Sequence, residues 1–167
     1  MLLPIKGPCG DVTPVVVIDS REQEPLPIHR LPTVTNGLTT GDYSILGCEN
    51  LFSVERKSIQ DLVACCMGEN RDRFERELHR LRGFRFKRLL IVGDKLDVSE
   101  HRYRSNLAPK AILSTLSAFE IRYDVPIVWL DTPELAANRL ESWAWWVCRE
   151  HLKTVTAMMA SGVESKN

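Results

Sequence analysis

Two charged residues in the first half of the chain have the types and the spacing needed to cut a phosphodiester bond. Glu55 and Lys57 follow residues 51–54, a mostly apolar run that is typical of a strand. Side chains two residues apart on a strand share a face, so Glu55 and Lys57 are expected to point the same way. The carboxylate can hold a divalent cation that activates water, and the lysine can orient that water. The pattern therefore predicts metal-assisted hydrolysis.

Asp42 can supply a second carboxylate if the chain folds back on itself. It follows Gly41 and begins another strand-like run, and residues 47–50 are typical of a turn. A hairpin of residues 42–47 and 51–57 would bring Asp42 close to Glu55 and complete an oxygen-ligand site. The alternative is structural. The Glu55–Lys57 pair would then be a surface ion pair worth less than about 1 kcal/mol, and Asp42 a turn residue.

Three further residues near these positions have two interpretations each. Asp19 ends a buried strand predicted at residues 15–19, where it could serve the site or cap a loop. Asp61 is the last residue of a helix capping box at residues 58–61, and it could also face the site. Arg56 should point to the opposite face from Lys57, so its side chain is not expected to line the catalytic surface. A direct role of Arg56 would use its backbone carbonyl.

Charge is distributed unevenly along a chain whose formal net charge is zero. Residues 1–70 carry nine acidic and five basic side chains, whereas residues 71–88 carry eight basic and three acidic ones. An acidic half beside a basic segment suits an enzyme that acts on a polyanion, and Arg71 and Arg73 could contact a DNA backbone. A solvated helix with many ion pairs is the structural alternative. Trp143, Trp145 and Trp146 could stack on bases, but we expect them to pack in the core or in an interface.

The order of predicted elements indicates a mixed α/β domain with a central sheet between helices. After the strand at 15–19 and the hairpin, helices are expected at residues 59–67 and from 70 to about 82, with Asn70 as a cap. A strand at 88–93, a helix at about 108–123, a strand at 127–130 and a helix from 132 follow, and residues 94–105 are expected to be a flexible loop. We predict an irregular segment at residues 1–14, one domain at 15–153 and a tail at 154–167.

Composition excludes several classes of protein. Hydrophobic residues make up 44% and charged residues 26% of the 167 residues, which is ordinary for a globular protein. No apolar run approaches the roughly 20 residues that a membrane helix needs, and the first residues do not resemble a signal peptide. The five cysteines and four histidines show no metal-ligand spacing, and the scattered cysteines favour a reducing compartment.

Three blocks of sequence together resemble the XPF-type nuclease family, which includes the xeroderma pigmentosum group F nuclease, Mus-type nucleases and archaeal Hef. The blocks are residues 17–22 (Val-Ile-Asp-Ser-Arg-Glu), Gly41-Asp42-Tyr43, and residues 54–62, which begin Val-Glu-Arg-Lys. The last block matches the family pattern E-R-K-x-x-x-D without a gap, and the resemblance extends over about residues 15–153. It implies a restriction-endonuclease-like fold.

The resemblance also implies an activity and a division of roles. It implies Mg²⁺- or Mn²⁺-dependent cleavage of branched or flap-bearing DNA in repair or recombination, with Asp42 and Glu55 as metal ligands. Lys57 would position the attacking water. Asp19, Arg21, Arg56 and Asp61 fall on motif positions that support the site. Many family members carry a tandem helix-hairpin-helix module after the nuclease domain, and this chain ends before one.

Two other functions are considered beside a structure-specific endonuclease. One is a non-catalytic, nuclease-like DNA-binding or scaffold subunit, and the other is a restriction-like or phage genome-processing nuclease. The resemblance suggests nuclease-domain pairing in a homodimer, for which the Trp-rich last helix offers an apolar face. We expect no membrane partner and no secretion, with a cytoplasmic location in a bacterium or phage-infected cell and a nuclear one in a eukaryote.

Overall fold

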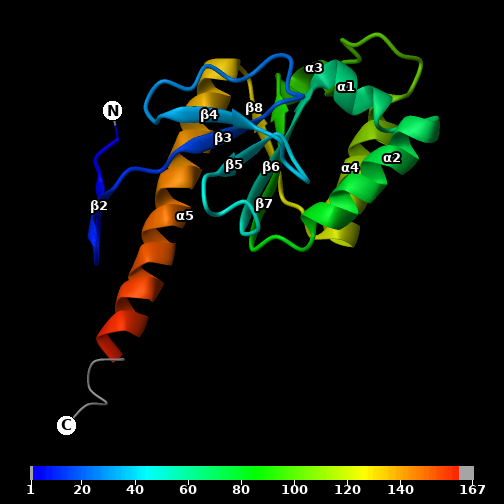
Figure 1. The fold of residues 1–167 in the computed structure, drawn as a ribbon. Coiled ribbons are helices and arrows are strands. Elements are labelled where there is room, and N and C mark those ends of the chain that lie inside the picture. The colour runs from blue at the N-terminus through cyan, green and yellow to red at the C-terminus, as the bar shows by residue number, and fades with distance from the viewer. Residues whose placement is uncertain (1, 162–167) are drawn as a thin grey trace.

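A six-stranded mixed sheet forms the centre of the fold, with helices packed on both of its faces (Figure 1). The computed structural model describes residues 2–161. The strands lie in the order β4-β3-β5-β6-β7-β8, so the two longest strands, β6 and β7, are neighbours in the middle. The strands are β3 (Val16–Asp19), β4 (Thr33–Asn36), β5 (Tyr43–Ile45), β6 (Phe52–Ser58), β7 (Phe86–Val92) and β8 (Ile127–Leu130).

Strand direction determines which residues can meet. β5 pairs antiparallel with both β3 and β6, whereas β3–β4, β6–β7 and β7–β8 are parallel pairs. β5 therefore runs against the other five strands. The end of β3, the start of β5 and the end of β6 consequently lie at the same edge of the sheet. This edge, called the catalytic edge below, brings together Asp19, Asp42 and the pair Glu55 and Lys57, although 38 positions separate Asp19 from Lys57.

The sheet separates two hydrophobic cores. α5 (Pro133–Ser161) covers one face, and α1 (Ile59–Ala64), α2 (Gly68–Leu81), α3 (Lys95–Ser99) and α4 (Pro109–Tyr123) cover the other (Figure 1). The buried strand β7 contributes to both cores, because Leu89 and Ile91 pack toward α2 and α4 while Leu90 packs toward α5. This alternation is the period of two that a strand requires. Packing on both faces therefore holds β6 and β7 in place, and the ends of these strands form part of the catalytic edge.

The predicted central sheet between helices is confirmed, and so is the hairpin of β5 and β6. Half of the predicted capping box is present, because the Ser58 hydroxyl accepts a hydrogen bond from the Asp61 backbone N–H at 3.2 Å, while the Asp61 carboxylate accepts the Ser58 hydroxyl in place of the Ser58 backbone N–H. Asn70 does not cap the next helix, since α2 begins at Gly68. None of the helices in residues 2–161 is long and apolar enough to span a membrane.

Three segments expected to be irregular are regular in part. The first 14 residues contain the hairpin strands β1 (Ile5–Gly7) and β2 (Gly10–Val12), which pair only with each other. The segment 94–105 contains α3, for which Asp94 acts as the N-cap. α5 continues to Ser161, beyond the expected fading at residue 154, and projects past the sheet (Figure 1). The expected tail beyond residue 161 lies outside the described residues.

Candidate active site

Glu55 and Lys57 form a buried ion pair at the end of β6. The Lys57 Nζ contacts Glu55 Oε1 and also lies 5.2 Å from the centroid of the Phe74 ring on α2. The two side chains therefore share a face of the strand, as their spacing predicts. The residue Glu55 is only 1% exposed, and its second oxygen, Oε2, is buried without a hydrogen-bond partner in residues 2–161. A buried carboxylate oxygen without a donor is costly unless a cation or water binds it.

Asp42 is fastened to the same stretch of β6. Its backbone N–H donates to the Val54 carbonyl at 2.9 Å, and its Oδ2 accepts the Arg56 backbone N–H at 2.7 Å. Gly41 makes this approach possible, because it has a φ of +78° and an added Cβ would lie 2.3 Å from Ser53 Oγ. The hairpin thus places the Asp42 carboxylate against the strand that carries Glu55, as the sequence predicts.

Burial and mutual repulsion perturb both carboxyl groups. Burial, opposed by the hydrogen bond from Arg56, raises the pKa of Asp42 to about 6. Burial also raises the pKa of Glu55 well above its ordinary value, and the negative charge of Asp42 adds to the effect. Burial opposes the charge of Lys57, but the Glu55 carboxylate outweighs it and raises the pKa of Lys57, so the ammonium stays charged. Two carboxyl groups with raised pKa values beside a lysine ammonium are characteristic of a functional site. A metal cation that binds such groups can displace their protons.

Two acidic residues near the site were not predicted as part of it. Glu22 follows β3, and its carboxylate lies 3.8 Å from the Arg56 guanidinium. Glu77 on α2 acts on the site through its charge, which contributes to the raised pKa values of Asp42 and Glu55. A regular sequence spacing does not relate Glu22 or Glu77 to Glu55, because the three residues come from different elements. The only signal for Glu22 was its place beside Arg21 in the first motif block.

The Arg56 side chain differs from the prediction. It does point away from Lys57, but it turns toward Glu22 at 3.8 Å and Glu24 at 3.5 Å and still borders the catalytic edge. It lines one hollow of about 340 Å³ together with Lys57. The reason is that β6 ends here, so side chains from both faces of the strand reach the same open rim. The full lining of this hollow is Arg21, Glu22, Gln23, Glu24, Asp42, Arg56, Lys57 and Asp61.

Asp19 and Arg21 form a brace behind the site. Asp19 is 2% exposed and accepts the Arg21 side chain at 2.7 and 3.1 Å, the Arg21 backbone N–H at 2.9 Å and the Leu38 N–H at 2.6 Å. The hydrogen bond from the Arg21 side chain is the main reason that the pKa of Asp19 is lowered. Arg21 also donates to the Leu38 carbonyl at 2.7 Å. These hydrogen bonds connect the end of β3 to Leu38 in the segment that leads to Asp42, and they occupy both carboxylate oxygens of Asp19.

Asp61 caps α1 and also borders the hollow that Lys57 lines. Its carboxylate accepts the Ser58 hydroxyl at 2.6 Å, which completes the cap of α1. It also lines the hollow described above and a second one of about 300 Å³ that lies toward α2. Lys57 and Asp61 are common to both hollows and therefore stand between them. The second hollow is lined by Lys57, Asp61, Ala64, Cys65, Asn70, Arg73, Phe74 and Glu77.

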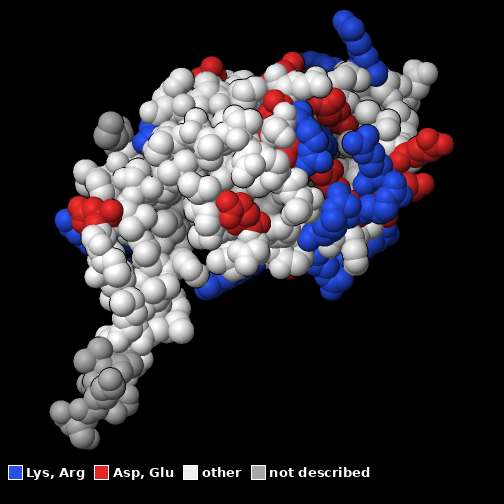
Figure 2. All heavy atoms as spheres, viewed as in Figure 1, with Lys and Arg blue, Asp and Glu red and all other residues white. Residues whose placement is uncertain are grey.

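The two arginines predicted to contact DNA differ in their surroundings. Lysines and arginines gather over α2, with acidic residues among them (Figure 2). Arg73 is exposed and lines the hollow beside Lys57. Arg71 is held by Glu75 at 2.9 Å and lies 5.3 Å from the centroid of the Phe119 ring. Arg73 is thus available to a ligand of the site, whereas Arg71 stabilises the packing of α2 against α4.

The residues present fit a divalent cation of the Mg²⁺ type. Asp42 and Glu55 offer carboxylate oxygens, and Glu55 Oε2 is buried without a hydrogen-bond partner in residues 2–161. The Arg56 N–H points toward Asp42, and the N–H and C=O of one strand residue point to the same neighbour, so the Arg56 carbonyl faces that side as well. Residues 2–161 contain no cluster of three His, Cys, Asp or Glu side chains of metal-binding geometry. Water and substrate oxygens would therefore have to supply the remaining ligands.

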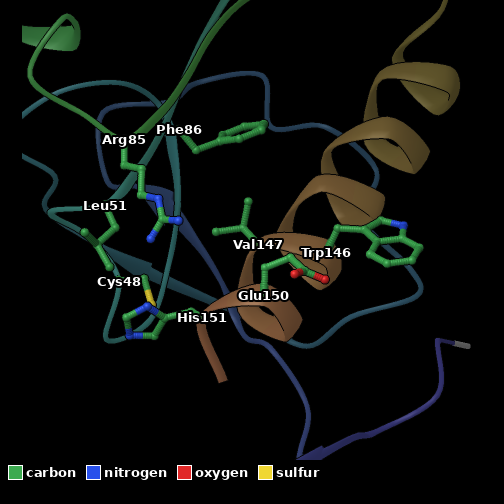
Figure 3. Close-up of a pocket in the computed structure, with 8 residues that line it drawn as sticks. All are labelled: Cys48, Leu51, Arg85, Phe86, Trp146, Val147, Glu150 and His151. Atoms are coloured by element: carbon green, nitrogen blue, oxygen red, sulfur yellow. The ribbon is translucent and has the colours of Figure 1, made fainter. Parts of the chain in front are cut away.

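A mainly apolar pocket lies away from this site. It has a volume of about 220 Å³ and is formed by the β5–β6 turn, the start of β7 and α5, at the opposite edge of the sheet (Figure 3). Trp146 and Val147 form one wall, and Leu51 and Phe86 form another. None of the residues predicted to be catalytic lines it. Trp145 donates a hydrogen bond to the Leu3 carbonyl at 2.7 Å, and Trp143 packs against the core on the α5 side of the sheet.

Comparisons with known proteins agree with the motif. The model of the ERCC4 domain family matches residues 18–142, which is most of the chain. A search of curated proteins found no match. The resemblance to XPF-type nucleases inferred from three short blocks is therefore confirmed, and the match covers residues 18–142 of the 15–153 that were expected.

Solved structures show the same fold. The XPF protein from Aeropyrum pernix matches with a TM-score of 0.64 and 20% identity over 80% of this chain and 61% of that one. A second structure, XPF from Aeropyrum pernix in complex with DNA, gives the same score and identity over 82% of this chain and 66% of that one. This chain thus spans less than two thirds of each. The predicted restriction-endonuclease-like fold, with a mixed sheet between helices, is confirmed.

Proposed function

The chain belongs to the ERCC4 domain family, and from this premise and the geometry of its site we propose that it is a metal-dependent DNA endonuclease. The observation that carries the proposal is the buried Glu55 Oε2 without a hydrogen-bond partner, next to the ion pair with Lys57 and to Asp42. A structural ion pair would satisfy both carboxylate oxygens or leave one in solvent. An orphaned oxygen at this position is instead suited to a cation.

Asp42, Glu55 and the backbone carbonyl of Arg56 would hold Mg²⁺, for which Mn²⁺ substitutes. When bound, such a cation lowers the pKa of water and offsets charge on the phosphate. The chain supplies the rest of the arrangement. The clip between Asp42 and the Arg56 N–H fixes the spacing of the two carboxylates, and the Asp19–Arg21 brace holds the segment before Asp42.

Lys57 would orient the attacking water. Its ammonium is kept charged by Glu55 and confined by the Phe74 ring, so it has little freedom to move away. Lys57 stands between the two hollows. The hollow that Asp42 lines can hold the cation and water, and the hollow toward α2 can hold the part of the substrate next to the scissile phosphate. Arg73 and Asn70 line this second hollow and can donate to phosphate or sugar oxygens.

We further propose that the substrate is DNA with branches, flaps or junctions between single and double strands. The support is the family, and a DNA complex is known for the XPF protein from Aeropyrum pernix. A homodimer through the nuclease domain belongs to the same proposal. Light scattering at working concentration tests it, and a monomer would remove it without affecting the site.

Cleavage of labelled flap, splayed-arm, four-way and plain duplex DNA with Mg²⁺ or Mn²⁺ tests the activity. Glu55→Gln and Lys57→Ala should lose at least a hundredfold in rate while they remain folded by circular dichroism. Glu134→Gln, an exposed carboxylate at the start of α5, is the matched control and should cut like wild type. Undiminished cleavage by Glu55→Gln would refute the site.

Calorimetric titration with Mn²⁺ separates the enzyme from its rivals. A non-catalytic scaffold would bind DNA but show no Mn²⁺ binding in the millimolar range. A restriction-like or phage genome-processing nuclease would bind Mn²⁺ and cut plain duplex at defined sequences. The proposed structure-specific nuclease binds Mn²⁺ through Asp42 and Glu55 and prefers the branched substrates.

A further inference from the structure

The loop between α3 and α4, residues 100–108, is held in one shape by its own side chains. The Tyr103 hydroxyl donates to the Leu107 carbonyl at 2.6 Å, and His101 Nε2 lies 2.8 Å from the Ser105 carbonyl. The rings of His101 and Tyr103 stack with their centroids 4.6 Å apart. His101 adopts a φ of 59°, a conformation that is unfavourable outside glycine and persists where the surroundings enforce it. The segment expected to be flexible is thus an ordered loop.

This loop is fastened beside the catalytic edge. The side chain of Gln60 donates to the Arg104 carbonyl at 3.3 Å and accepts the Arg104 backbone N–H at 3.4 Å. Gln60 belongs to α1, which begins directly after Lys57 and Ser58. α3 follows β7, whose end lies at the same edge as the end of β6. Figure 1 accordingly shows the loop next to α1. The two hydrogen bonds from Gln60 therefore set the position of Arg104 relative to the site.

The charges on the loop are arranged in two different ways. Arg102 is paired with Asp97 at 3.2 Å and with Glu100, so its charge is neutralised locally. The exposed Arg104 side chain makes no ion pair or side-chain hydrogen bond within residues 2–161. Residues 101–110 contain three lysines or arginines and no acidic residue. An ordered loop thus presents one uncompensated guanidinium beside an acidic metal site, which is an arrangement that attracts a polyanion.

We propose that the α3–α4 loop is a DNA-backbone contact in which Arg104 binds a phosphate of the substrate. The inference rests on the proposed function, since DNA is the polyanion that the neighbouring site would cut. Arg73 borders α1 from α2 and Arg104 borders it from the loop, so the two arginines hold the substrate from two different elements. A phosphate is the expected partner because a planar guanidinium binds it in a bidentate manner, and because backbone contacts set the register of bound DNA.

Fluorescence anisotropy with labelled flap DNA in EDTA, at several salt concentrations, tests the contact without cleavage. Arg104→Ala should weaken binding roughly tenfold and lower the slope of log K against log salt by about 0.7 to 0.9, because one phosphate contact is lost. Arg104→Lys should keep most of the slope, since it keeps the charge. Arg102→Ala is the matched control from the same loop and should change affinity less than twofold.

The outcomes distinguish this inference from the proposed function. Equal affinity and equal salt slope for Arg104→Ala and wild type would overturn the contact, even if wild type cuts DNA. Binding that depends on Arg104 in a protein that fails to cut any substrate with Mg²⁺ or Mn²⁺ would support the contact and reject the endonuclease. Absence of DNA binding by wild type would overturn the contact. Gln60→Ala should reproduce part of the Arg104→Ala effect, because it frees the loop and leaves the charge.

Discussion

Replacing Asp42 by asparagine should stabilise the protein in the absence of metal and destroy its cation site. The pKa of Asp42 rises from 3.8 to about 6 on folding, mainly because the carboxyl group is buried. At pH 7 the ionised group is therefore held in an unfavourable environment. Asparagine has nearly the same shape, and its Oδ1 can still accept the Arg56 N–H that Asp42 accepts at 2.7 Å. The substitution thus removes the charge and keeps the structural clip.

The magnitude follows from the linkage between protonation and folding. A shift of about two pKa units corresponds to roughly 3 kcal/mol at pH 7, and about half of this remains near pH 5. Because the folded state has the higher pKa, it binds more protons between about pH 4 and pH 6. The stability of metal-free wild type should therefore rise as the pH falls through this window. Asp42 and Glu55 titrate as a coupled pair, so the pKa shift does not belong to Asp42 alone. We therefore expect Asp42→Asn to raise the free energy of unfolding by about 1 to 3 kcal/mol at pH 7.

Urea unfolding in EDTA, followed by tryptophan fluorescence at pH 5, 6, 7 and 8, measures the difference between the two proteins. Taking the difference cancels the titration of the four histidines, which both proteins share. Mn²⁺ should then stabilise wild type and leave Asp42→Asn unchanged. An Asp42→Asn protein that is less stable than wild type at pH 7 without metal would refute the reasoning. So would a difference that does not shrink as the pH falls.

Four more substitutions test other parts of the structure. Gly41→Ala should cost about 2 kcal/mol or more in urea unfolding and weaken Mn²⁺ binding in calorimetry, because φ is +78° and the new Cβ would lie 2.3 Å from a hydroxyl oxygen. Glu141→Ala should cost on the order of 3 kcal/mol by the same unfolding assay, because this buried carboxylate accepts the backbone N–H groups of residues 29–31; an unchanged midpoint would contradict it. Arg73→Ala should weaken DNA binding in anisotropy, whereas Arg71→Ala should mainly lower stability; the reverse order would assign the DNA contact to Arg71.

Elements with a strong internal pattern were predictable, and elements that depend on their surroundings were not. β8 and the second half of β7 are apolar runs, and α4 and α5 begin at prolines, so local sequence suffices to place them. The β1–β2 hairpin has two three-residue strands, and α3 has five residues. Such short elements gain little from their own propensities and are stabilised by packing against the rest of the fold. Their sequences consequently look like loops.

The candidate site shows the same division. Asp42, Glu55 and Lys57 could be found because a hairpin and the period of a strand relate them over a short stretch. Glu22 and Glu77 reach the same edge from a loop and a distant helix, so only the three-dimensional fold relates them to the site. For Asp19, the strand-end position predicted where the residue lies, but its contacts could not be predicted from the sequence. Its hydrogen bonds to Arg21 and to a distant backbone amide depend on how the following loop closes.

The prediction for Arg56 was wrong about its surface for a reason that explains the whole Glu-Arg-Lys block. Strand alternation points the Arg56 side chain to the opposite face from Glu55 and Lys57. β6 ends close to this point, however, so side chains from both of its faces can border the same hollow. The Arg56 guanidinium can therefore hold Glu22 and Glu24 while the Arg56 backbone N–H holds Asp42. In the proposed function, three consecutive residues would thus supply one metal ligand, one connection between two loops and one lysine for the reaction. A strand end is well suited to this, because it fixes the backbone rigidly and leaves both faces accessible to loops.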